Sequence, residues 1–71
     1  MTSDDLRIAR GNLGLTTRGL ASVLRLGANG DRRVRRMESG EIEISGPVEV
    51  AIEAMIDGWW PEGFDDSGFA Q

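Results

Sequence analysis

The chain has 71 residues and a net charge of −4, and all eight of its basic residues are arginine. It contains no cysteine and no histidine, which excludes disulfide frameworks and the usual zinc ligands, so we expect no metal and no other cofactor. This length allows one small domain. No apolar run could span a bilayer, and the N-terminus lacks the basic start and apolar stretch of a signal peptide, so we expect a cytoplasmic protein without membrane contact.

Charge is divided unevenly along the chain. Residues 1–40 hold all eight arginines and four acidic residues, a net charge of +4, whereas residues 41–71 hold eight acidic residues and no basic one, a net charge of −8. Such asymmetry indicates an anionic partner for the first half and repulsion of that partner by the second. A GC-rich genome would also favour arginine over lysine, so the use of arginine alone does not decide between binding and codon bias.

Glycines divide the chain into stretches with helical periodicity. A glycine is preferred just past a helix end, where it adopts the left-handed conformation without strain, and the relevant positions are Gly14, Gly27, Gly40 and Gly58. The first helix is predicted over about residues 4–13. Thr2 and Asp5 have the spacing of a capping box at its start. Gly11 weakens its interior by about 1 kcal/mol relative to Ala.

Three further helices follow. The second is predicted to begin with Thr16 as N-cap and to end near residue 26, and the third covers roughly residues 31–39. The fourth opens with Gly46 as the cap and Pro47 at the first helical position. The apolar positions expected to face inward are Leu20, Ala21 and Leu24 in the second helix, Val34 and Met37 in the third, and Val48, Ala51, Ile52 and Met55 in the fourth. The alternation at period two in "EIEIS" covers only four residues, and no other stretch alternates clearly, so the fold class is all-α.

An arginine cluster marks the third helix. Its members are Arg32, Arg33, Arg35 and Arg36, and they follow a connection that contains Asn29 and Gly30. With Val34 and Met37 on the core, the arginines lie on the exposed arc of the helix, where two or three can enter a DNA major groove together. The connection and the helix N-terminus can meet a phosphate. Two short helices joined by a tight glycine-containing connection describe a helix-turn-helix. The alternative is a solvated basic face paired with the acidic second half.

Three segments resemble the Cro/C1-type (XRE-like) helix-turn-helix family: "LGLTTRGLASVLRLG", "VRRMESGE" and "ISGPVEVAIEAM". The resemblance covers about residues 5–57. It implies a compact, lambda-repressor-like domain of four to five helices over residues 1–58, followed by an aromatic and acidic tail over residues 59–71. Within the family the chain is most similar to short regulators of phages and mobile elements, some of which repress small operons, including anti-CRISPR operons.

Asn29, in the connection before the third helix, is expected to contact a phosphate. The resemblance implies further DNA contacts for Thr17, Arg18, Arg32, Arg33, Arg35, Arg36 and Ser39. It gives Glu38 a structural contact instead. Two departures bear on these roles. Thr17 stands where the family commonly has Gln, and the connection "RLGANGD" is about three residues longer than usual, which affects the register of the third helix.

Together these features predict a sequence-specific repressor of double-stranded DNA. One module this small buries too little surface for tight binding, so we expect a homodimer on a palindrome. Met55, Trp59 and Trp60 are the expected dimer contacts. The alternative is a protein-interaction module, such as an antitoxin or an inhibitor, that binds a partner protein with the same scaffold. An enzyme is not expected, because a mechanism would depend on carboxylates alone.

Overall fold

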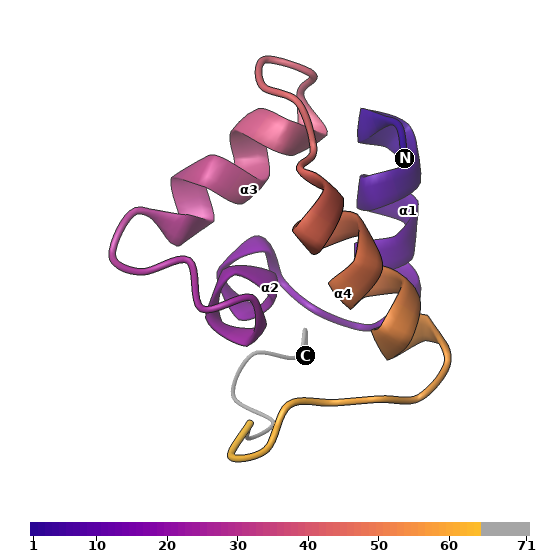
Figure 1. The fold of residues 1–71 in the computed structure, drawn as a ribbon. Helices are drawn as coiled ribbons and strands as arrows, with labels where there is room; N and C mark the ends of the chain where they lie inside the picture. Colours follow the sequence, from indigo (N-terminus) through magenta and orange to yellow (C-terminus); the bar gives the residue numbers. More distant parts are fainter. Residues whose placement is uncertain (65–71) are drawn as a thin grey trace.

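The computed structural model describes residues 1–64, and four helices make up the fold of this part of the chain (Figure 1). They are α1 (Ser3–Asn12), α2 (Thr17–Val23), α3 (Gly30–Glu38) and α4 (Gly46–Ile56). No strand occurs within residues 1–64, so the predicted all-α class is confirmed. The helix α3 packs against both α2 and α1. In the same range, none of the helices is long and apolar enough to cross a membrane.

The first two helices begin at the caps that the sequence predicts. The Asp5 amide donates to the Thr2 hydroxyl at 3.1 Å, and the Thr2 amide donates to the Asp5 carboxylate at 3.1 Å, which completes the capping box. The hydrogen bond from the Thr2 backbone, followed by the one from its side chain, lowers the pKa of Asp5. At the start of α2, the Gly19 amide donates to the Thr16 hydroxyl at 2.9 Å.

The helices α1 and α3 begin and end one residue before the predicted positions, and α2 and α4 each differ from the prediction at one end. The helix α2 ends at Val23 and not near residue 26, because Leu24 is its C-cap and Arg25 takes the left-handed conformation with φ of 55°. An L-residue in that conformation is disfavoured by about 1–2 kcal/mol. At α4 the N-cap is Ser45 and not Gly46, which is already the first helical residue.

The core forms where the helices meet. Its most deeply buried side chains are each at most 2% exposed, and they are Leu6, Leu15, Leu20, Val34, Ile52 and Met55. Val23 is also buried, whereas Leu24, predicted to face inward, is only partly buried. Trp60 and Phe64 pack against the core and stack on each other, with ring centroids 5.5 Å apart. The first part of the predicted tail therefore joins the domain, and residues 65–71 lie outside the described residues.

Close contact between α2 and α3 depends on Gly30. A Cβ atom at this position would lie 2.8 Å from Leu26 Cβ and 2.9 Å from Ala21 Cβ, closer than real Cβ contacts allow. Gly30 is buried as the first residue of α3. Its role is therefore to let the two helices approach, which corrects the expectation that it faces a phosphate.

Candidate nucleic-acid interface

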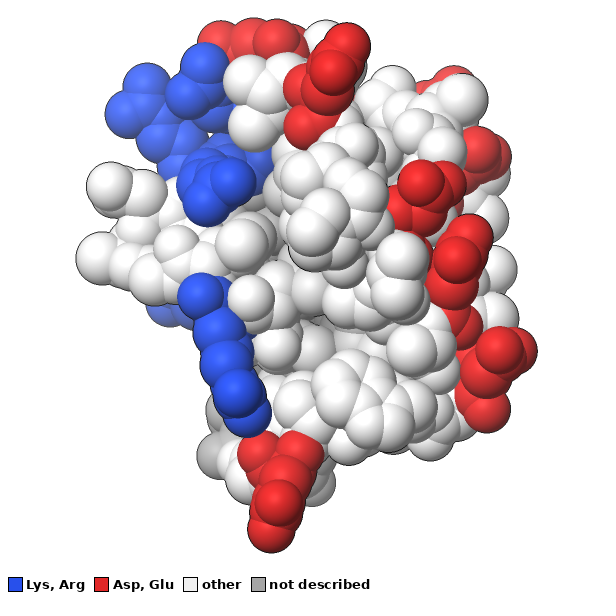
Figure 2. All heavy atoms as spheres, in the orientation of Figure 1, with Lys and Arg blue, Asp and Glu red and all other residues white. Residues whose placement is uncertain are grey.

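Many of the arginines and many of the acidic side chains gather on different sides of the molecule. Figure 2 shows arginines gathered on the left, over α2 and α3, and a column of acidic side chains along the right edge, over α1 and α4. The helices α1 and α4 carry Asp4, Asp5, Glu49 and Glu53. The division in space only partly follows the division along the sequence: α2 and α3 pack together with their arginines, whereas α1, from the first half of the chain, carries Arg7 beside Asp4 on the acidic side.

The main feature of the arginine side is an open groove of about 680 Å³ between α2 and α3, which we call the basic groove. Its charged lining is Arg18 and Arg25 from the α2 side and Asp31, Arg32 and Arg35 from α3, and its remaining lining is Ala21, Ser22, Gly27, Ala28 and Asn29. Four guanidinium groups thus face one carboxylate. Four residues predicted to bind DNA, Arg18, Asn29, Arg32 and Arg35, meet in this groove.

The single carboxylate of the basic groove has partners on two helices. The Thr17 hydroxyl donates to Asp31 Oδ1 at 2.5 Å, and Arg35 lies 3.2 Å from Asp31 Oδ2. The donor of the Thr17 hydroxyl is therefore in use within the protein. The contact between Thr17 and a phosphate stays a prediction that this hydrogen bond does not favour.

Arginines without an intramolecular ion pair dominate the rest of the basic groove. Among residues 1–64, no carboxylate lies within ion-pair distance of Arg18, Arg25 or Arg32. All three are exposed. Asn29 is also exposed and caps α3 without a side-chain hydrogen bond, so its amide can contact a ligand. These groups give the groove an excess of positive charge in an acidic protein, which attracts anions.

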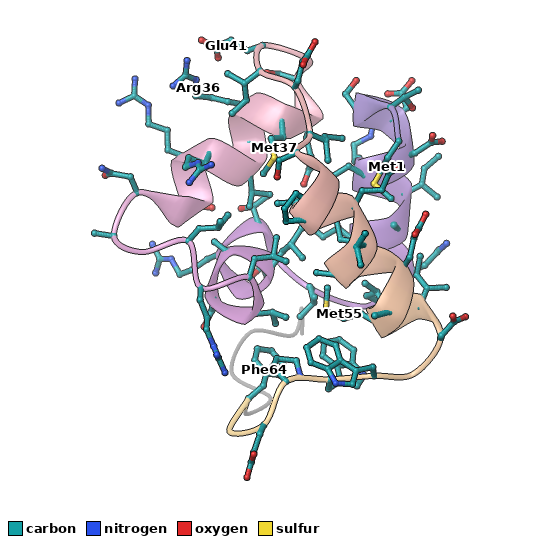
Figure 3. All side chains as sticks on the ribbon, in the orientation of Figure 1. Met1, Arg36, Met37, Glu41, Met55 and Phe64 are labelled. Atoms are coloured by element: carbon teal, nitrogen blue, oxygen red, sulfur yellow. The ribbon has the colours of Figure 1, made fainter. Side chains whose placement is uncertain are left out.

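The remaining predicted contacts lie elsewhere on α3. Arg33 lines a different groove, described below. Arg36 Nε lies 3.3 Å from Glu41 Oε1, and Figure 3 shows the two side chains together near the end of α3. The Ser39 hydroxyl donates to the Arg36 carbonyl at 3.0 Å. The structure therefore divides the arginine cluster, and only Arg32 and Arg35 line the basic groove.

Arg25 is a groove residue that the sequence analysis did not assign to DNA. A continuous second helix to residue 26 gave no reason to single it out. Its left-handed backbone follows the early end of α2, and its side chain lines the basic groove. The nearest signal in the sequence is Gly27, which predicts a helix end near residue 26, whereas α2 ends at Val23.

An apolar groove of about 410 Å³ lies between α2 and the start of α4. Its lining includes Leu24, Leu26, Pro47, Val48, Ala51, Trp59 and Pro61, with Arg25, Arg33 and Glu62 among its charged residues. Trp59 is 53% exposed, so it remains available to a partner. Met55 is only 2% exposed and belongs to the core (Figure 3), so the dimer contact predicted for it is corrected. Trp60 is partly buried against the same core.

No protein-family model, no curated protein and no solved structure matches this chain. What can be concluded about function therefore depends on the basic groove, on the two charged sides of the molecule and on the sequence resemblance. The class of protein that these features define is a small all-helical domain with an anion-attracting face.

Proposed function

We propose that the protein is a sequence-specific regulator that binds double-stranded DNA through a helix-turn-helix formed by α2 and α3. The observation that carries the proposal is the basic groove, where Arg18, Arg25, Arg32 and Arg35 converge in a chain of net charge −4. The nine residues of α3 make a helix about 13 Å long. The width of an α-helix with its side chains fits the major groove of B-DNA.

The acidic residues support a single orientation on DNA. Glu49 and Glu53 on α4 line a surface between α1 and α4 and not the basic groove, so the duplex can approach α2 and α3 without meeting them. The acidic helices α1 and α4 would repel the DNA phosphates, and the arginines of α2 and α3 would attract them. Together these forces would place α3 in the major groove. The protein would act in the cytoplasm, as a repressor that occupies its operator.

Two copies on a palindromic operator complete the proposal. A single domain of this size offers little surface to DNA, and two half-sites about one helical turn apart raise the affinity. The apolar groove is the proposed subunit contact, because Trp59 is exposed there and Arg33 and Glu62 lie in the same surface. In a twofold dimer these opposite charges can pair across the interface.

Selection from a random duplex library tests the DNA proposal. We expect one duplex family to be enriched, and Arg32→Ala to weaken its binding at fixed salt. Arg7→Ala is the matched control, since it removes an exposed arginine that pairs with Asp4 on α1, outside the basic groove. Equal losses in both variants, or no enrichment by the unaltered protein, would overturn the proposal.

The second candidate is a protein-interaction module, with no catalytic activity in either case. It is favoured by a surface between α1 and α4 where Ile8 and Ile56 are more than half exposed beside Asp5, Glu49 and Glu53. Such a surface suits a basic partner protein. Capture of a stoichiometric protein, with no protection of any duplex, would favour this second function.

A further inference from the structure

The carboxylate of Asp31, on α3, contacts α2 through one oxygen and its own helix through the other. Oδ1 accepts the Thr17 hydroxyl hydrogen bond at 2.5 Å, and Oδ2 lies 3.2 Å from the Arg35 guanidinium nitrogen Nη2. Thr17 is the first residue of α2, and Arg35 stands one turn after Asp31 on α3. The Asp31 side chain is only 29% exposed. Asp31 is therefore held by α2 while it pairs with an arginine of its own helix, α3.

This arrangement changes what Arg35 can bind. A paired carboxylate offsets part of the guanidinium charge, which weakens its attraction to a phosphate. The pair also restricts the rotamers of a long side chain, so that less freedom is lost when Arg35 binds. The Arg35 side chain is 64% exposed, so most of the guanidinium fork remains open to a ligand.

Arg32 offers a contrast in the same basic groove. It lies three residues before Arg35 on α3 and also lines the groove, but no carboxylate within residues 1–64 pairs with it. Arg32 is exposed, and among the described residues no paired carboxylate offsets its charge. Two arginines of one surface therefore differ in how far a carboxylate offsets their charge and in the freedom of their side chains, and Asp31 causes both differences.

The two ligands that DNA offers differ in the same respects. A phosphate is an anion, and its contact depends on charge and releases counterions. The edge of a guanine is neutral and presents O6 and N7 in one plane, which suits a guanidinium fork of fixed orientation. An arginine that is fixed by a paired carboxylate suits the guanine edge, and an arginine without a paired carboxylate suits the phosphate.

We propose that Asp31 is a positioning residue for specificity: it directs Arg35 to a guanine edge, and the unpaired Arg32 binds the phosphate backbone. Thr17 supports this role by fixing Asp31 from α2. The inference depends on the proposed DNA-binding function, and it adds which arginine reads a base and which group makes it do so.

The first test compares the duplex selected by the unaltered protein with a random duplex at one salt concentration. For Asp31→Asn we expect tighter binding of the random duplex, because a negative charge is lost, and a fall of about tenfold in the ratio of the two affinities. With Arg35→Ala as the background, Asp31→Asn should leave that ratio unchanged. Circular dichroism verifies that each variant is folded.

A second pair of variants separates positioning from charge. Thr17→Val removes the hydrogen bond to Asp31 without changing any charge, so it should lower the same affinity ratio, whereas Thr17→Ser should retain it. The salt dependence gives an independent measurement. Arg32→Ala should reduce the slope of log affinity against log salt by about one, and Arg35→Ala should reduce it by less.

The outcomes distinguish the two proposals. If Asp31→Asn raises the affinity for both duplexes by the same factor, or if Arg35→Ala reduces the salt slope as much as Arg32→Ala does, the positioning role is overturned while DNA binding stands. If the unaltered protein prefers no duplex, the proposed function itself is overturned.

Discussion

Arg10 and Glu38 join the ends of α1 and α3 through two parallel contacts, Nε to Oε2 at 2.6 Å and Nη2 to Oε1 at 3.0 Å. Their side chains are only 21% and 10% exposed. A third nitrogen of Arg10, Nη1, donates to the Leu15 carbonyl at 3.0 Å, in the segment that leads into α2. One guanidinium thus connects three parts of the fold, and the structural contact that the resemblance implied for Glu38 is confirmed.

We expect Glu38→Gln to destabilise the protein by about 1.5–3 kcal/mol, the range for hydrogen bonds to charged groups. The variant leaves the half-buried Arg10 without its carboxylate partner, which accounts for most of the loss. Urea denaturation gives the change in the free energy of unfolding. Asp4→Asn, which removes the partner of exposed Arg7, is the control and should cost less than 1 kcal/mol. Equal costs for the two variants would contradict a special role for the Arg10–Glu38 pair.

Two Gly→Ala substitutions should have opposite effects on stability. Gly30→Ala places a methyl group against Leu26 and Ala21, so we expect a loss of about 1–3 kcal/mol. Gly11→Ala lies in α1 with no atom within 4 Å of the new Cβ, so we expect a gain of up to about 1 kcal/mol. Thermal melting of both variants measures the two effects. A melting temperature that rises with Gly30→Ala would show that α2 and α3 are not in close contact there.

Arg25→Gly should raise stability and lower DNA affinity at once. Glycine adopts the positive φ of this position without strain, so we expect a gain of about 1 kcal/mol. The same change removes a guanidinium from the basic groove, and the salt slope of DNA binding should fall by about one. Arg25→Lys is the matched variant, which keeps the charge and the strain. A stability gain from Arg25→Lys would argue against the backbone explanation.

The capping box makes the stability of the fold depend on pH at acidic pH. The hydrogen bonds from Thr2 lower the pKa of Asp5 below its ordinary value of 3.8. A lowered folded-state pKa means that the ionised Asp5 stabilises the fold above the unfolded-state pKa, and that this contribution disappears as the pH falls through the folded-state pKa. Between about pH 5 and pH 2, the melting temperature should therefore fall more for the unaltered protein than for Asp5→Asn. Parallel curves would show that the capping box makes no pH-dependent contribution.

Local signals in the sequence predicted most of the helical framework. The capping box of Thr2 and Asp5, the cap at Thr16 and the inward positions Val34 and Met37 all involve residues within one or two turns of each other. Such interactions depend on helix geometry alone, so spacing reveals them. The end of α2 was missed because an arginine, and not a glycine, occupies the left-handed position.

The sequence predicted the candidate interface only in part, because many of its contacts join residues far apart in the chain. The sequence by itself determined that the first half is basic, that the second half is acidic and that Val34 and Met37 turn the arginines outward. Only the tertiary structure decided that Arg32 and Arg35 share a groove with Arg18, and that Arg33 lines another. Contacts such as Thr17 to Asp31 and Arg10 to Glu38 join residues 14 and 28 positions apart. They exist because α2 and α1 pack on α3 at one distance and orientation, which no local pattern specifies.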